Sequence, residues 1–256
     1  MVNFLSKTFA ITEMEVRKIM HDPTELLTRS FQPIIWLLLF GQVMAQAHII
    51  TVGNMTYLDY LTPGILAQSI LFVAIFYGIA VIWERDLGII HKLLVTPTPR
   101  IALVLGKALA AGIRALSQVI VIYLLAALLG VKLSYAPLSL IGVCIFTLLG
   151  AAIFATFSLI IACIVKTRER FMGIGQVMTM PLFFASNAIY PLTMMPTWLK
   201  IFARFNPLTY EVDAFRVFML STPSTMHGVL FDFIVLVLTL LALLVMGAWI
   251  YPQIAR

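Results

Sequence analysis

The sequence predicts an all-α integral membrane protein, and its composition, its apolar runs and its charge distribution all indicate this class. Hydrophobic residues make up 62% of the 256 residues and charged residues only 11%, and the mean hydropathy is +1.04. Soluble proteins carry about 25% charged residues, so a chain this apolar cannot cover a water-facing surface. The net charge of +6 does not indicate nucleic-acid binding, because the basic residues fall in small clusters between apolar runs.

Six apolar runs predict six transmembrane helices, since one span needs about 20 residues. The runs cover residues 31–50, 61–83, 108–130, 138–165, 171–189 and 228–251. An even number of spans places both termini on one side of the membrane. The chain therefore reads as one transmembrane domain over residues 1–256, with three segments outside the spans at 1–25, 84–98 and 190–226, and without room for a soluble catalytic domain.

Residues 1–25 predict an amphipathic helix rather than a seventh span. Glu13 and Arg17 are four residues apart and can pair, while apolar residues recur at helical spacing on another face, at Leu5, Phe9, Val16, Ile19 and Met20. Such a helix can lie along the cytoplasmic membrane surface. An ordinary solvated helix is the alternative.

The positions of the basic residues predict the orientation. Of the 17 Lys and Arg residues, twelve fall in the N-terminal stretch, the loops at 84–107 and 166–170, and the C-terminus. The opposite loops carry only Lys132, Lys200, Arg204 and Arg216. Because cytoplasmic loops are enriched in Lys and Arg, both termini are predicted to be cytoplasmic.

The loop at 84–98 is the first candidate functional segment. Three consecutive charged residues stand directly after the second predicted span, and Gly88 then permits a turn. A short helix is predicted to follow, and prolines end it. Its candidate contact residues are Glu84, Arg85, Asp86, Gly88, His91, Lys92, Thr96 and Pro97. A short helix bounded in this way can dock into a groove on a partner, or it can simply connect two spans; the spacing leaves both interpretations open.

The outer segment at 190–226 is the second candidate. Pro191, Pro196 and Pro207 divide it into short pieces. Trp198, Leu199 and Phe202 give the first piece an apolar face. Asn206 is placed to cap the next helix, with Pro207 at its first position. In that helix four apolar residues share a face, and Asp213 and Arg216 are three apart and can pair. Two interfacial helices without a transport role are the alternative.

Polar residues within the spans are the third candidate. Arg114 and Gln118 are four residues apart on one helical face. They can line a path for an anionic headgroup, or Arg114 can snorkel to the cytoplasmic interface. Every Asp and Glu is predicted outside or at the edge of a span, with Asp232 the closest, which counts against ion coupling.

Motifs for chemistry are missing from the sequence. It has neither a Gly-x-x-x-x-Gly-Lys-Ser/Thr phosphate loop nor a Gly-x-Ser-x-Gly elbow. The four His residues are far apart in sequence, so no metal site is predicted, and Cys144 and Cys163 lie in apolar runs. The chain is therefore not expected to be an enzyme.

Two motifs resemble those of ABC-2 type exporter permeases. One is Asn206-Pro-Leu-Thr-Tyr210 with Asp213 and Arg216; the other is Glu84-Arg85 with Gly88 and Thr96-Pro97. The resemblance covers essentially the whole chain. It departs from the family pattern at Ile89, Ile90 and His91, where hydroxylated, aromatic or acidic residues are common.

The resemblance implies the roles of both segments. Loop 84–98 would hold the coupling helix that contacts a separate ATPase subunit, and Pro191, Pro196, Asn206, Pro207, Tyr210, Asp213 and Arg216 would lie in re-entrant outer helices that gate the path. ATP and Mg would bind to two copies of the ATPase, with no cofactor in this chain, and a second copy of the permease would complete the path.

The resemblance further implies outward export of an amphipathic substrate, whether a drug, a lipid or a lipid-linked glycan. Export would cross the cytoplasmic membrane of a bacterium or archaeon. A non-ABC secondary carrier and a non-transporting membrane assembly subunit are the alternatives.

Overall fold

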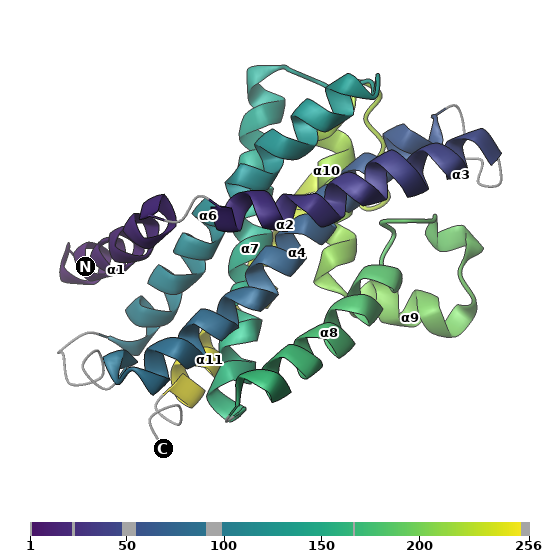
Figure 1. Ribbon diagram of the computed structural model, residues 1–256. Helices are drawn as coiled ribbons and strands as arrows, with labels where there is room; N and C mark the ends of the chain where they lie inside the picture. The colour runs from purple at the N-terminus through teal and green to yellow at the C-terminus, as the bar shows by residue number, and fades with distance from the viewer. Residues whose placement is uncertain (1, 22–23, 48–54, 91–98, 166, 252–256) are drawn as a thin grey trace.

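The structure is a computed structural model that describes residues 2–21, 24–47, 55–90, 99–165 and 167–251, and it is almost entirely helical over these ranges (Figure 1). The all-α prediction is confirmed. In chain order the elements are α1 (Val2–His21), α2 (Thr24–Ile35), the π-helix η1 (Trp36–Gly41), α3 (Gln42–Ala47), α4 (Tyr57–Asp86), α6 (Arg100–Leu128), α7 (Pro137–Ile164), α8 (Arg168–Phe184), the 3-10 helix η2 (Leu192–Met194), α9 (Thr197–Phe205), α10 (Pro207–Met219) and α11 (Val229–Ile250).

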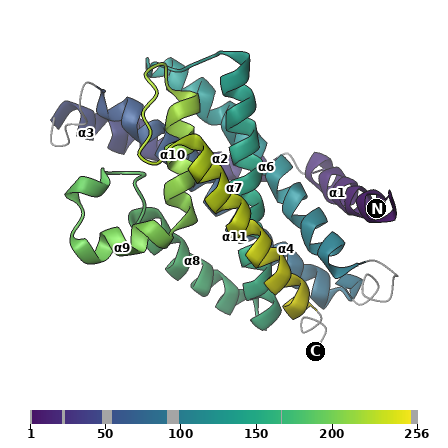
Figure 2. The same ribbon diagram turned by 180° about the vertical axis from the view of Figure 1, so that it is seen from behind.

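Four of the described helices are long and apolar enough to cross a membrane: α4, α6, α7 and α11. Helix α4 is mostly buried and packs against both α6 and α7, so it forms the centre of the bundle. Helix α11 lies on the other side of α7 and is mostly exposed (Figure 2). Within the single chain most side chains of α4 are buried, whereas most of those of α11 are at least partly exposed. The exposed apolar side chains of α11 therefore need lipid or a neighbouring chain to cover them.

The predicted spans at 31–50 and 171–189 take a different form. The first is divided into α2, η1 and α3, with Pro33 inside α2. Gly41 closes η1 where the segment meets α4, since a Cβ there would lie 2.9 Å from Leu58 Cδ2. The second region holds α8, which ends at Phe184 soon after Pro181. Neither is among the four long apolar helices, because proline and the close approach to α4 interrupt regular α-helix.

The N-terminal segment is helical as predicted and packs along α6. The Thr12 hydroxyl donates to the Gly106 carbonyl at 3.2 Å, and a Cβ at Gly106 would lie 2.9 Å from Ile11 Cβ. The predicted pair of Glu13 and Arg17 forms at 2.7 Å. These contacts attach α1 to α6, while its place on the membrane surface stays a prediction.

Helix α10 lies antiparallel along the first half of α7. A Cβ at Gly142 would lie 2.6 Å from Phe218 Cγ, and one at Gly150 would meet the carboxylate of Glu211. Thus the end of α10 is level with the start of α7, and its beginning is near the middle of α7. The predicted apolar face of α10 is confirmed, because its four members are fully buried: Leu208, Val212, Phe215 and Met219.

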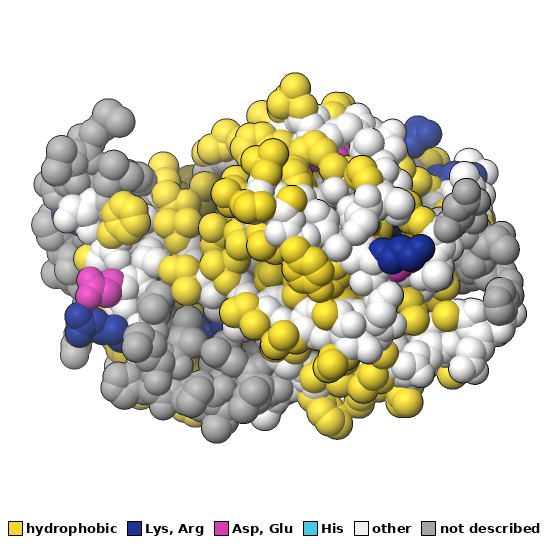
Figure 3. All heavy atoms as spheres, turned by 90° about the horizontal axis from the view of Figure 1, so that it is seen from above, with side chains coloured by type: hydrophobic (Ala, Val, Ile, Leu, Met, Phe, Trp, Pro, Cys, Tyr) yellow, Lys and Arg dark blue, Asp and Glu magenta, His cyan; other side chains and the backbone are white. Residues whose placement is uncertain are grey.

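The outer surface of the bundle is strongly apolar. Hydrophobic side chains cover much of the face that Figure 3 shows, with only scattered charged ones. Trp249 on α11 is 75% exposed and Leu128 at the end of α6 is 85% exposed. An apolar surface of this extent requires a membrane or a partner chain to cover it.

Candidate functional site

A buried ion pair joins the C-terminal end of α4 to the N-terminal part of α6. Lys107 Nζ contacts Glu84 Oε2, and the two side chains are 1% and 7% exposed. Burying two charges is costly, so a buried pair is maintained only when the partners face each other closely. Sequence reasoning selected Glu84 but treated Lys107 only as a topological charge, since 23 residues separate them.

A second, more exposed cluster follows Glu84 directly. Arg85 donates to the Val165 carbonyl at the end of α7, at 3.1 Å. Asp86 accepts from Arg85 at 3.1 Å and from Arg168 at 2.9 Å. The Arg168 guanidinium also stacks 3.7 Å from the ring centroid of Trp83. At the C-terminal end of α4, Arg85 and Asp86 therefore contact α7 and α8, while Glu84 contacts α6.

The turn after this cluster forms at Gly88 as predicted. Its φ is +72°, a left-handed conformation that glycine adopts without strain. Its N–H donates to the Arg85 carbonyl at 2.9 Å. Helical backbone resumes at residues 89–90, and the remaining predicted coupling residues, His91, Lys92, Thr96 and Pro97, lie outside the described residues.

Prolines begin the short helices of the outer segment. Pro191 directly precedes η2, and Pro196 directly precedes α9. Helix α9 projects from the bundle in Figure 1 and exposes its apolar face, with Trp198 62% and Phe202 67% exposed. Its predicted amphipathic character is confirmed.

Asn206 connects α8 to α10. Its side-chain oxygen accepts from the Leu208 N–H at 3.0 Å, which confirms the predicted cap with Pro207 at the first helical position. Its Nδ2 donates to the carbonyls of Leu182 and Ala185 at 2.6 and 3.1 Å. One side chain therefore hydrogen-bonds a free backbone N–H at the start of α10 and two backbone carbonyls at the end of α8.

Two tyrosine hydroxyls in this segment donate hydrogen bonds to backbone carbonyls six residues earlier in the chain. The Tyr210 hydroxyl donates to the Arg204 carbonyl at 2.6 Å, and the Tyr190 hydroxyl donates to the Phe184 carbonyl at 2.6 Å. Burial raises the pKa of Tyr190, so this hydroxyl keeps its proton and its hydrogen bond at neutral pH.

The predicted pair of Asp213 and Arg216 is wrong, since no ion pair within 4.0 Å joins them among the residues the structure describes. Arg216 donates to the Asn187 carbonyl, and its guanidinium lies 3.8 Å from the ring centroid of Tyr60. Asp213 accepts from the backbone N–H of Met226 at 2.9 Å. Buried tertiary partners thus outcompete the local contact across one helical turn.

Glu211 is a site residue that sequence reasoning missed. It is fully buried against Gly150 in the middle of α7. Neither carboxylate oxygen has a hydrogen-bond partner in the described part of the chain. Glu211 lies outside the predicted spans, as expected, but α10 carries its carboxylate to Gly150 in the middle of α7. Its place directly after the Asn206–Tyr210 motif was the available signal.

Arg114 and Gln118 lie between helices in the folded chain. The Arg114 guanidinium is 5.2 Å from the ring centroid of Tyr77 on α4. Gln118 is fully buried, and its amide nitrogen Nε2 donates to the Ser30 hydroxyl of α2 at 3.2 Å. The two residues thus join α6 to its neighbours, and a role in lining the path stays a prediction.

Comparison with known proteins shows which family and which relatives this chain is similar to. The family model described as "ABC-2 type transporter" matches residues 6–220. A protein of Cyanophora paradoxa named as a transport permease, ycf38, is 30% identical over 217 residues, which cover 83% of this chain and 74% of the relative. A Mycobacterium tuberculosis protein named as a doxorubicin resistance ABC transporter permease, DrrC, is 25% identical over 89% of this chain and 82% of its own length. The inner membrane transport permease YadH of Escherichia coli is 23% identical over 78% and 79%.

Proposed function

This chain belongs to the ABC-2 type transporter family, and from that premise we propose that it exports an amphipathic substrate by alternating access. It is the multi-pass permease subunit of such a transporter and not an enzyme. Permeases of ABC transporters pair with ATPase subunits, in which ATP and Mg are bound. The alternatives of a non-ABC carrier and an assembly subunit are overturned by the family assignment.

The proposed topology has six spans with both termini in the cytoplasm. Segment α2–η1–α3 and helix α8 serve as the spans that add to the four long helices. Figure 1 supports a common side, because the C-terminal end of α11 lies at the same end of the bundle as the C-terminal end of α4 and the start of α6. The basic residues concentrated in that connection support its cytoplasmic placement.

Loop 84–98 is proposed to transmit the movement of the ATPase to the spans. The observation that carries this proposal is the buried pair of Glu84 and Lys107, which adjoins the cluster of Arg85, Asp86 and Arg168. Because these contacts join the ends of α4, α6, α7 and α8, a force on the loop acts on four helices together. ATP binding shifts the equilibrium only by binding one state more tightly than the other.

Helix α10 is proposed as a re-entrant outer gate. At 1.5 Å per residue its 13 residues extend about 20 Å, and its antiparallel contact with α7 carries Glu211 level with Gly150. Backbone inside a membrane must be covered by protein, and the burial of α10 meets that condition.

A pair of these chains with two ATPase copies is the proposed assembly. The exposed apolar face of α11 and the exposed end of α6 offer surface for a second copy or for lipid. The drug-resistance name of one relative, DrrC, and the apolar character of the bundle support an amphipathic substrate.

The experiment is purification of the tagged chain from its host membranes in mild detergent, followed by an assay of ATP hydrolysis. We expect a Walker-motif subunit to copurify with vanadate-sensitive activity, in equal copies. Glu84→Gln should keep the ATPase bound but lower the substrate exported per ATP hydrolysed. Glu169→Gln, an exposed change near the same end, is the control. An isolated inert chain, or normal export by Glu84→Gln, would refute the coupling role.

A further inference from the structure

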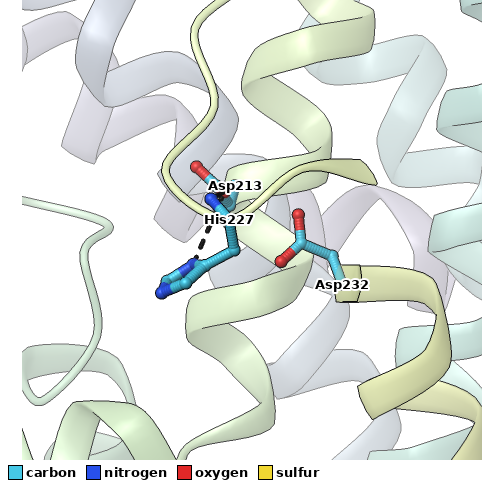
Figure 4. A group of neighbouring side chains, drawn as sticks. All are labelled: Asp213, His227 and Asp232. Carbon is cyan, nitrogen blue, oxygen red and sulfur yellow. Dashed lines mark hydrogen bonds and ion pairs between the residues drawn. The ribbon is translucent and has the colours of Figure 1, made fainter. Parts of the chain in front are cut away.

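Three possible metal ligands converge where α10, the loop after it and α11 meet (Figure 4). They are Asp213 of α10, His227 of the loop and Asp232 in the first turn of α11. One ligand atom from each lies within 4.8 Å of the other two. The four histidines are far apart in the sequence and Asp232 stands at the edge of a predicted span, so only the fold reveals this cluster.

Asp232 provides a second and independent observation. Its side chain is fully buried, and neither carboxylate oxygen has a hydrogen-bond partner among the residues described. Figure 4 shows this carboxylate turned toward Asp213 and His227. A buried carboxylate without hydrogen bonds is costly unless a cation or a proton accompanies it.

The protein supplies too little positive charge to neutralise the carboxylates of both Asp213 and Asp232. Asp213 is also fully buried, and Arg216 interacts with it electrostatically. The Arg216 guanidinium, however, is directed to the Asn187 carbonyl and the Tyr60 ring. One guanidinium offsets one carboxylate, and the charge of Asp232 remains to be offset by something else.

The surroundings of Asp213 suit a metal ligand. The Thr225 hydroxyl and the N–H groups of Met226 and His227 donate to its Oδ2 at 3.1, 2.9 and 3.2 Å. Hydrogen bonds of this kind orient ligating carboxylates from outside. His227 Nδ1 lies 3.8 Å from the same oxygen, and its side chain is 33% exposed, which leaves an access route for an ion and for a water ligand.

We propose that Asp213, His227 and Asp232 form a binding site for a divalent transition metal of the Zn²⁺ class. Zinc binds imidazole nitrogens and carboxylate oxygens, and a site with three protein ligands keeps a fourth position for water. Calcium fits less well, because it takes six to eight oxygen ligands. The bound ion joins α10, the loop at 220–228 and α11, and it stabilises the outer segment in the described arrangement. This proposal does not depend on the substrate or on the coupling role of loop 84–98.

The test is equilibrium dialysis of the purified complex, after chelator treatment, against ZnCl2, MnCl2 or CaCl2, with the metal measured by mass spectrometry. We expect one Zn²⁺ per permease chain and no retained calcium. Asp232→Asn and His227→Gln should each weaken zinc binding by about tenfold or more, whereas Glu169→Gln, which removes an exposed carboxylate elsewhere, should not. Zinc should also raise the Tm of the wild type but not that of Asp232→Asn.

His227→Gln keeps the proposal testable if Asp232→Asn fails to fold, because His227 is partly exposed. Unchanged zinc stoichiometry and affinity in both variants would overturn the site. So would the absence of bound zinc in the wild type. If metal-free protein instead gains stability as the pH falls, and Asp232→Asn abolishes that gain, the two carboxylates share a proton and the metal site is refuted.

Discussion

Removing the Glu84 carboxylate tests the buried ion pair most directly. Glu84→Gln keeps the shape of the side chain but leaves the Lys107 ammonium, which is 1% exposed, buried without that carboxylate. Breaking one partner of a buried pair costs about 3–5 kcal/mol. For a chain of this size each kcal/mol lowers Tm by about 2–4 °C, so we expect Tm to fall by about 6–20 °C.

The double variant separates the charge effect from the packing effect. In Glu84→Gln with Lys107→Met both charges are removed while the volumes are nearly kept, so most of the lost stability should return. The thermal unfolding of the wild type, both single variants and the double variant in one detergent completes a double-mutant cycle. If Glu84→Gln melts within about 2 °C of the wild type, or if the double variant is no more stable than the single ones, the ion pair does not hold α4 to α6.

Two further changes test the packing of the outer segment. Gly64→Ala should destabilise the chain by about 1–3 kcal/mol, since the new Cβ would lie 2.8 Å from the Ala188 Cα and a backbone atom cannot move aside cheaply. Gly173→Ala on α8 is the control, because a Cβ there has nothing within 4 Å, and it should stabilise by about 0.5–1 kcal/mol. Equal Tm shifts of the two variants would contradict the described packing. Asn206→Ala should cost about 1–2 kcal/mol through the lost cap alone, measured by urea or thermal unfolding. Asn206→Asp keeps the capping oxygen but should also be destabilised, because it places an oxygen where the amide now donates to the Leu182 and Ala185 carbonyls; a wild-type Tm for either variant would refute the double role.

Local features of the structure follow from short stretches of sequence. Gly88 turns with positive φ after a charged helix end, and Asn206 caps a helix that begins at Pro207. Both outcomes depend on residues within one helical turn, where sterics and capping act directly. The same holds for the Glu13–Arg17 pair.

The interrupted regions show where hydropathy alone is insufficient. Runs 31–50 and 171–189 are apolar enough to suggest spans, yet the first contains a π-helix and the second ends its helix at Phe184. Apolar composition reports preference for the membrane, but the length of a regular helix also depends on Pro33, on Pro181 and on the approach of Gly41 to α4.

The sequence by itself determined that this is an all-α membrane protein, with a charged exit after one long helix and a capped outer helix, because hydropathy, capping and turn chemistry are sums over near neighbours. Only the tertiary structure decided which charges meet. Glu84 pairs with Lys107 across 23 residues, Asp213 turns from Arg216 toward the loop at 225–227, and Glu211 packs on Gly150. In a low-dielectric interior a charged group takes the partner that the packing of distant helices brings within reach, and no local spacing specifies that packing.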